Sequence, residues 1–407
     1  MNAPALHQAL VEHLKREGHL RSPSIEAAFR TVPRHVFLPQ ISLDAAYQDE
    51  AIPTKQVEGK AVSSSSQPAI MAIMLEQLGL APGQRVLEIG AGTGYNAALM
   101  AHIVGPTGQI VALDIDEDIV QAAREHLAAT GYSNVQVMCA DGGMGWPEAA
   151  PYDRIILTVG ARDILPAWRE QLKPDGRLVL PLSLPGTQQS AAFLPAPDHL
   201  VSVSLVDCGF MMLRGEWAEA DPVLPLGPEP GLSLTHPTPT TLDGTALFTF
   251  LTGPTQDWPT GLHTTPPELW GGLLPWLGRH APDRCTLTVE RPLAYLPAPP
   301  CLMGQPDKGC LAPGLLSKNG LGFLVYPNEW RLGTPIELRV RQFGPDPAPA
   351  QRLLNHVRAW EAAGRPTTTR SRIRAYPIEM AIELPPEAFV VSRRWTRFVL
   401  DERPPVV

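Results

Sequence analysis

The chain has 407 residues, of which 44% are hydrophobic and 18% charged, with a formal net charge of −8. This length predicts about two domains of roughly 100–200 residues each, and the apolar content excludes extensive disorder. The acidic balance argues against a nucleic-acid-binding surface, because such surfaces neutralise phosphates with Lys and Arg. Five cysteines without a Cys-x-x-Cys pair favour free thiols over disulfides or a metal site.

The N-terminus carries no feature of a targeting segment. Residues 1–20 are polar and interrupted by charges, so they lack the apolar core of a signal peptide. No run of about 18 apolar residues occurs in the chain, so no membrane-spanning helix is expected. We therefore expect a cytoplasmic protein, monomeric or dimeric, that binds neither nucleic acid nor membrane.

The first 60 residues are expected to form a helical segment ahead of the main fold. Residues 4–16 place four apolar side chains on one helical face, as in a helix that docks on a core. Residues 61–66 end in four serines, for which a flexible loop is the simplest structural interpretation. Pro68 predicts the start of a further helix, because proline suits the first helical turn.

From residue 85 onward, short apolar segments alternate with amphipathic ones. Strands are predicted at residues 85–89, 109–113, 135–139, 154–159 and 177–182, and helices at 96–103, 117–129 and 164–172. This alternation predicts a parallel, doubly wound α/β sheet. Two further strands, at 191–194 and 201–206, suit an antiparallel pair at one edge.

The composition changes near residue 217. Of the 45 prolines, 29 lie beyond residue 220, and the regular alternation stops there. Helices are predicted at residues 266–277 and 350–363, and strands at 285–289, 322–326 and 336–342. We therefore expect two domains, one over residues 1–216 and a second, α+β domain over residues 217–407.

The strongest chemical signal is a glycine-rich turn directly after the first predicted strand. Its residues are Glu88, Ile89, Gly90, Ala91, Gly92, Thr93, Gly94 and Tyr95. The glycines permit a tight turn and let a ligand approach the backbone closely. A Gly-x-Gly-x-x-Gly spacing would indicate a dinucleotide, whereas the tighter Gly-x-Gly-x-Gly form after an acidic residue is typical of enzymes that use S-adenosylmethionine (SAM). Glu88, Gly90, Ala91, Gly92 and Gly94 are therefore candidate cofactor residues.

Two acidic residues follow the next strands. Asp114 ends the second predicted strand, where a carboxylate can accept hydrogen bonds from both ribose hydroxyls. Asp141 and Gly142 follow the third strand, where an adenine would lie. Each has a simpler interpretation, as a helix cap for Asp114 or an ordinary turn for Asp141 and Gly142. Their common register at successive strand ends favours a nucleoside pocket.

These elements together predict a Rossmann-like, SAM-dependent methyltransferase domain with doubly wound topology. A nicotinamide-dependent oxidoreductase on a similar sheet remains an alternative, although no proton-relay constellation for hydride transfer is evident. A non-catalytic binding module is a further alternative.

The chain also resembles the protein-L-isoaspartate O-methyltransferases. The similarity begins at Val32-Pro33-Arg34 and covers roughly the first half of the chain. The matching segments are residues 32–39, 46–49, 66–68, 86–95, 141–145, 150–153 and 171–181. The Ser-x-Pro segment ahead of the glycine turn is the family-specific part.

The resemblance implies roles for the serine run. In the family, a Thr-Ile-Ser-x-Pro segment closes over the cofactor and touches the substrate carboxylate. Ser66 matches the active-site serine of that segment, and Ser64 stands where threonine is usual. The resemblance thus implies that Ser66 and Ser64 are catalytic, and we assign the neighbouring Ser63 to the cofactor.

The implied substrate is a protein or peptide that carries an isoaspartyl or aspartyl residue. Repair of isoaspartyl residues is one function that the resemblance implies. The polar serine run and the long C-terminal half also resemble methyltransferases that modify an aspartate in ribosomally made peptides, whose ester then closes to a succinimide. In that alternative the second domain would hold the precursor peptide.

Overall fold

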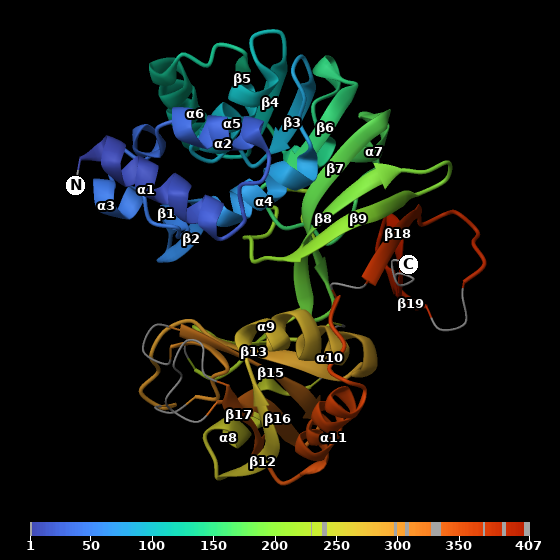
Figure 1. The fold of residues 1–407 in the computed structure, drawn as a ribbon. Coiled ribbons are helices and arrows are strands. Elements are labelled where there is room, and N and C mark those ends of the chain that lie inside the picture. The colour runs from blue at the N-terminus through green and yellow to red at the C-terminus, as the bar shows by residue number, and fades with distance from the viewer. Residues whose placement is uncertain are drawn as a thin grey trace. The chain divides into compact units, whose positions relative to one another are not determined.

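The computed structural model describes residues 2–228, 230–237, 242–296, 299–305, 309–326, 335–368, 371–384 and 388–402 (Figure 1). The chain forms two compact units. Unit 1 comprises Met1–Ser183, Gln188–Glu219 and Ser371–Val407, and unit 2 comprises Leu184–Thr187 and Ala220–Arg370. The last segment thus returns to unit 1, which the expected division at residue 216 did not include.

A ten-stranded sheet forms the centre of unit 1. In spatial order its strands are β19 (Phe389–Ser392), β20 (Thr396–Glu402), β18 (Ser371–Pro377), β9 (Leu200–Asp207), β8 (Thr187–Pro195), β7 (Leu172–Leu184), β6 (Tyr152–Leu157), β3 (Arg85–Ile89), β4 (Gln109–Asp114) and β5 (Val135–Cys139). Strands β5, β4, β3, β6 and β7 pair in parallel, whereas β8 with β9, β9 with β18, and β18 to β20 pair antiparallel. The predicted α/β class and doubly wound topology are confirmed.

Helical elements surround the parallel strands of unit 1 (Figure 1). They are α1 (Ala3–Arg16), α2 (Pro23–Thr31), η1 (Arg34–Phe37), α3 (Leu43–Ala46), α4 (Pro68–Leu78), α5 (Tyr95–Val104), α6 (Glu117–Thr130), η2 (Gly142–Met144), η3 (Pro147–Ala149) and α7 (Pro166–Glu170). Helix α4 begins at Pro68 as predicted and ends where Gly79 turns left-handed. Helix α7 is shorter than predicted, because β7 already begins at Leu172.

The parallel strands lie in the core of unit 1. Val86, Leu87, Val111 and Leu157 are fully buried, as expected for strands covered on both faces. The N-terminal helices extend the same core, and the apolar face of α1 is buried in it. This rigid framework fixes the carboxyl ends of β3 and β4, where the predicted cofactor residues lie.

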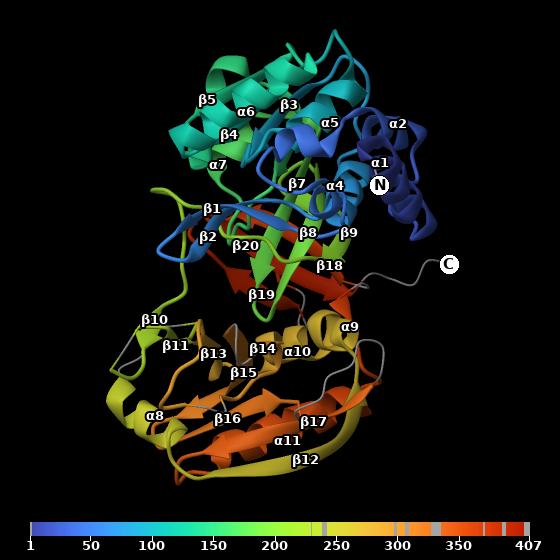
Figure 2. The ribbon, with the colours of Figure 1, turned by 90° about the vertical axis from the view of Figure 1, so that its left-hand side faces the viewer.

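Strands β1 (Ile52–Val57) and β2 (Lys60–Ser65) form a separate two-stranded hairpin (Figure 2). Its second strand contains the first three serines of the run, and their exposure alternates as a strand requires. The interpretation of residues 61–66 as a flexible loop is therefore wrong for residues 61–65, because they lie in a paired strand.

Unit 2 is built on an antiparallel sheet. Its order is β10 (Val223–Pro225), β11 (Leu232–Thr235), β13 (Arg284–Val289), β15 (Gly309–Ser317), β16 (Gly320–Val325), β17 (Ile336–Phe343) and β12 (Thr255–Thr264), and β14 (Met303–Gln305) also pairs with β15. The helical elements are α8 (Gly244–Leu251), α9 (Pro266–Glu268), η4 (Leu269–Leu273), α10 (Leu274–His280) and α11 (Ala348–Ala362). The predicted α+β character of this region is confirmed.

One predicted helix of unit 2 is interrupted. Residues 266–277 divide into α9, the π-helical turn η4 and the start of α10. Pro275 lacks the N–H that a regular helical turn requires, and Gly271 and Gly272 weaken the preceding turn. The interruption therefore follows from the residues of the segment itself.

Two expectations from composition concern cysteines and membranes. The five cysteines are free thiols, as predicted. Within the described residues, no group of three or more metal-ligating side chains gathers. In the same part of the chain, no helix has the length and apolar character needed to cross a membrane.

Candidate active site

A cavity of about 600 Å³ lies in unit 1 at the carboxyl ends of β3 and β4. The glycine turn forms one wall, residues 61–67 form another, and residues 207–214 form a third. Its volume falls in the range of about 300–1,000 Å³ that small-molecule sites occupy. This position is also where ligands bind in doubly wound sheets.

The glycine turn is fixed to the end of β4. The backbone N–H groups of Gly90 and Ala91 both donate to the carbonyl oxygen of Leu113, at 2.8 Å. Gly90 has a φ of 101°, and a Cβ at this position would lie 2.6 Å from Oγ1 of Thr158. Glycine is therefore required at position 90 both by the backbone conformation and by space.

Asp114 lies at the end of β4 and contacts this turn directly. Its Oδ2 accepts a hydrogen bond from the backbone N–H of Gly92 at 3.0 Å. Burial raises the pKa of Asp114, while the N–H of Gly92 opposes that shift. The residue lines the cavity, so its carboxylate can also accept hydrogen bonds from a bound ligand's hydroxyl groups.

Glu88 lies behind the turn rather than along the cavity. It is fully buried, and Oε1 accepts a hydrogen bond from Nδ2 of Asn96 at 2.7 Å. Its Oε2 is buried without a hydrogen-bond partner, and burial raises the pKa of Glu88 to about 8. Burial thus favours the neutral form of this side chain, and its hydrogen bond to Asn96 joins the end of β3 to α5.

Gly94 and Asp141 contact other parts of the protein and do not line the cavity. Gly94 directly precedes α5, and a Cβ there would lie 3.4 Å from Ala123. The Asp141 carboxylate accepts from the backbone N–H groups of Gly143, at 2.9 Å, and Glu216, at 2.7 Å. Neither residue lines the cavity, whereas Gly142 does.

The serine run and the glycine turn share the cavity. Ser63, Ser64 and Ser66 all line it, together with Gly90, Ala91, Gly92, Asp114 and Gly142. The backbone oxygen of Ser64 lies 3.6 Å from the point where a Cβ on Gly92 would stand. Oγ1 of Thr54 donates to Oγ of Ser63 at 3.2 Å. The serine run and the glycine turn, which are separated in the sequence, thus line the same cavity.

Two residues hold the serine run in place. Arg34 is fully buried and donates to the backbone oxygen of Ser66, at 3.1 Å, and to Oγ of Ser65, at 3.4 Å. Asp49 accepts from the backbone N–H of Ala69 at 2.8 Å and from the Gln67 side chain at 3.0 Å. Arg34 therefore holds the end of the serine run, and Asp49 holds the residues that directly follow it.

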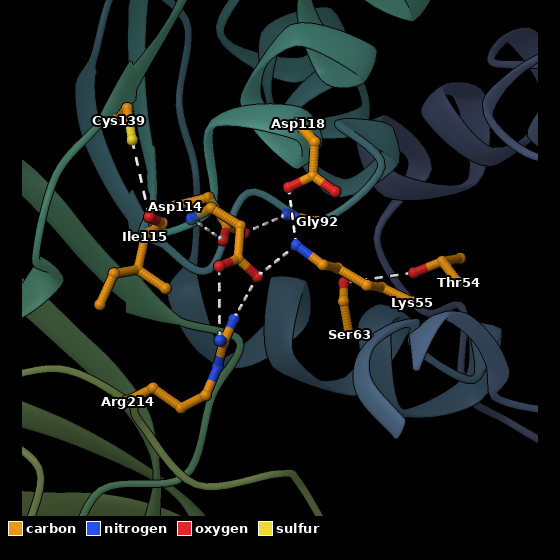
Figure 3. A network of polar contacts seen from close by, with 10 residues as sticks. Thr54, Lys55, Ser63, Gly92, Asp114, Ile115, Asp118, Cys139 and Arg214 are labelled. Carbon is orange, nitrogen blue, oxygen red and sulfur yellow. Dashed lines mark hydrogen bonds and ion pairs between the residues drawn. The ribbon is translucent and has the colours of Figure 1, made fainter. Parts of the chain in front are cut away.

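The sequence did not indicate several residues around the cavity. Thr158 donates through Oγ1 to the backbone oxygen of Gly90 at 2.5 Å. Lys55 and Arg214 both form ion pairs with Asp116. Figure 3 shows these two cationic side chains beside Asp114. Only the position of Asp116, two residues after Asp114, could have suggested a role. The others become neighbours through the fold.

The glycine turn and the Asp114 carboxylate lie at the ends of adjacent parallel strands, and the serine run lines the same cavity. This arrangement defines the class as a Rossmann-like, SAM-dependent methyltransferase. The volume of the cavity and the Asp114 carboxylate that lines it both fit SAM, which carries ribose hydroxyl groups.

Comparisons with known proteins give the family. The family model of protein-L-isoaspartate(D-aspartate) O-methyltransferase matches residues 5–213, about half of the chain. The chain therefore belongs to the protein-L-isoaspartate(D-aspartate) O-methyltransferase family. It is 42% identical over 176 residues to the protein-L-isoaspartate O-methyltransferase of Methanopyrus kandleri, covering 43% of this chain and 76% of that one. It is 37% identical over 208 residues to that of Ignicoccus hospitalis, covering 51% and 96%.

A solved structure of a protein-L-isoaspartate O-methyltransferase resembles almost the whole chain. The match has a TM-score of 0.51 and 23% identity, and it covers 90% of this chain and 96% of that chain. At this identity the likeness concerns the fold. It extends beyond the first 213 residues, so the fold of this longer chain has a counterpart among solved structures.

Proposed function

We propose that this protein transfers the methyl group of SAM to the carboxylate of an isoaspartyl residue in a protein or peptide. The observation that carries the proposal is the shared cavity of Ser66, Gly92 and Asp114. The names of the relatives support the same acceptor. We also propose a cytoplasmic location, where the enzyme would meet the cellular proteins that it repairs.

The proposed reaction requires no proton transfer to or from a protein side chain. SAM supplies a methyl group on a sulfonium, which leaves as a neutral thioether. A substrate carboxyl has an ordinary pKa of about 4, so it is already an anion at neutral pH and needs no general base. The task of the site is to align the carboxylate oxygen with the methyl group and to exclude water.

Ser66 suits this task. Its hydroxyl can donate a hydrogen bond that orients a carboxylate, without the full charge by which a lysine would hold the anion back. We assign Ser64 a supporting role beside it and Ser63 a place on the cofactor side. The contacts of Arg34 with Ser66 and of Asp49 with Ala69 hold the backbone on either side of Gln67, which fixes where the Ser66 side chain begins.

Asp114 and the glycine turn are proposed to hold the nucleoside. The Asp114 carboxylate can accept hydrogen bonds from ribose hydroxyls while it keeps the N–H of Gly92. Gly142 is proposed to lie at the adenine. Glu88 and Asp141 contribute indirectly, Glu88 by its hydrogen bond to Asn96 behind the turn and Asp141 by holding residues 143 and 216.

Aspartate methylation in a precursor peptide is a second candidate. The polar strand of Ser63, Ser64 and Ser65 favours it, because the family segment has an apolar residue at the position of Ser65. The long second unit does not by itself favour it, because the fold of almost the whole chain also occurs in a solved structure named protein-L-isoaspartate O-methyltransferase.

The test incubates the protein with SAM that carries a labelled methyl group, together with an isoaspartyl peptide or an aspartyl peptide of the same sequence. A base-labile label on the isoaspartyl peptide alone is expected. A label on the aspartyl peptide, or on a peptide encoded beside the gene, would favour the second candidate. Absence of transfer to all three peptides would contradict carboxyl methylation.

A further inference from the structure

The carboxylate of Asp116 binds cationic side chains from two separate segments. Nη2 of Arg214 lies 2.6 Å from its Oδ2, and Nη1 lies 3.4 Å from its Oδ1. Nζ of Lys55 lies 3.2 Å from the same Oδ2. Lys55 also reaches Asp118, at 2.7 Å. Figure 3 shows Lys55 and Arg214 extending toward one another beside Asp114.

The two cations come from the two segments that cover the cavity. Lys55 lies on β1, and its hairpin partner β2 carries Ser63 and Ser64 into the cavity wall. Arg214 follows β9, in the segment 207–214 that forms another wall. Asp116 thus links two covers that the sequence places about 160 residues apart.

The position of Asp116 lets it anchor both the β1–β2 hairpin and the segment 207–214. It precedes α6 directly, and its backbone N–H contacts Oδ1 of Asp114 at 3.4 Å. The guanidinium of Arg214, and then the ammonium of Lys55, lower the pKa of Asp116 and keep it ionised. Its partners lie on the covers, whereas Asp116 itself belongs to the sheet framework.

We propose that Asp116, Lys55 and Arg214 are positioning residues that together form a clasp over the cofactor site. The clasp holds the serine-bearing hairpin and the segment 207–214 against the nucleoside, and it opens when the cofactor exchanges. This inference rests on the proposed use of SAM. It adds residues that control how long the cofactor stays bound.

The ion pairs of the clasp are weak enough to break when the cofactor exchanges. Lys55, Arg214 and Asp116 are partly exposed, with side-chain exposures of 27%, 41% and 19%. Exposed ion pairs contribute little individually, so breaking one should accelerate cofactor release by about fivefold, and breaking both by about twentyfold. Because salt screens such pairs, the release rate of the wild-type protein should rise with ionic strength.

The experiment measures the release of S-adenosylhomocysteine (SAH), the demethylated form of SAM, by stopped-flow fluorescence. The variants are Lys55→Met, Arg214→Met and Asp116→Asn, each compared at low salt and at about 1 M salt, where the Debye length is about 3 Å. Each variant is expected to release SAH faster at low salt. Asp116→Asn, which breaks both pairs, should lose the salt dependence, whereas Lys55→Met and Arg214→Met should reduce it. Asp116→Glu, which keeps the charge, should recover most of the wild-type behaviour.

Glu12→Gln is the matched control. Glu12 forms a partly exposed ion pair with Arg30, at 2.7 Å, and neither residue lines the cavity. This variant should release SAH at the wild-type rate.

The clasp is overturned if Asp116→Asn releases SAH as slowly as the wild type at low salt. It is also overturned if all the variants keep the wild-type salt dependence. Failure of the wild-type protein to bind SAH would instead contradict the proposed use of SAM, and the clasp with it. The two failures are therefore distinguishable.

Discussion

The guanidinium of Arg34 donates a hydrogen bond to the backbone oxygen of Ser66, at 3.1 Å, across 32 positions of the sequence. The same side chain donates to the backbone oxygens of Ala46, Gln48 and Glu50. Burial lowers the pKa of Arg34, although the nearby tyrosines and Asp49 oppose that shift. A buried arginine therefore fixes the backbone of the proposed catalytic serine.

Replacing this arginine by lysine should lower both stability and turnover. Lysine keeps the charge but cannot serve two diverging sets of acceptors, as the planar guanidinium does. We expect Arg34→Lys to lose about 2–4 kcal/mol of unfolding free energy, because buried carbonyls lose their donors. Urea unfolding and turnover at saturating SAM measure the two effects. Arg30→Lys, on the partly exposed face of α2, is the control and should change little.

The burial of Glu88 makes stability depend on pH in a defined direction. Its pKa is raised from 4.5 to about 8 in the folded protein. Below pH 4.5 both the folded and the unfolded chain keep this proton, so Glu88 causes no penalty. Between pH 4.5 and 8 the unfolded chain ionises while the folded chain retains the proton, so the folded state loses relative stability.

Glu88→Gln should remove this dependence, because glutamine does not ionise and can still accept from Asn96. The variant is expected to gain unfolding free energy relative to the wild type as pH rises from 5 to 8, by up to about 1.4 kcal/mol per pKa unit. Urea unfolding at several pH values measures the difference. A difference that stays constant across this range would show that Glu88 is not the group responsible. The exposed Glu125→Gln serves as a control.

The space at Gly90 predicts a destabilising substitution with a matched control. In Gly90→Ala the added Cβ would meet Thr158 at 2.6 Å and Val159 at 3.0 Å, at a φ of 101°. Gly131 has a φ of 78°, with nothing within 4 Å of a Cβ. Both variants carry backbone strain, but only Gly90→Ala adds a clash, so it should lose about 1–3 kcal/mol more than Gly131→Ala. Thermal unfolding compares them, and equal losses would contradict the clash.

Much of the sheet could be predicted from local patterns. The apolar strands around Val86 and Val111 and the amphipathic helix after Asp116 have periodicities that identify them without any partner. The glycine turn and Asp114 could be assigned because residues at the ends of adjacent parallel strands lie close together. That inference agrees with the hydrogen bond between Asp114 and Gly92.

Non-local pairings could not be predicted. Strand β18 pairs with β9 through Arg374 and Val201, and no local pattern shows which strand a distant segment will join. The pairing of Lys55 with Asp116 likewise depends on how the hairpin lies over the sheet. The serine run looked like a loop because its strand character depends on its pairing with β1.

In the proposed site, one cavity has a nucleoside side at Asp114 and a carboxylate side at Ser66. The most direct test measures initial rates of methyl transfer to an isoaspartyl peptide as a function of SAM concentration. Asp114→Ala should raise the KM for SAM about 10–100-fold, with turnover largely recovered at saturation. Ser66→Ala should leave that KM nearly unchanged and lower kcat by about 10-fold or more. Wild-type kinetics in both variants would contradict the account.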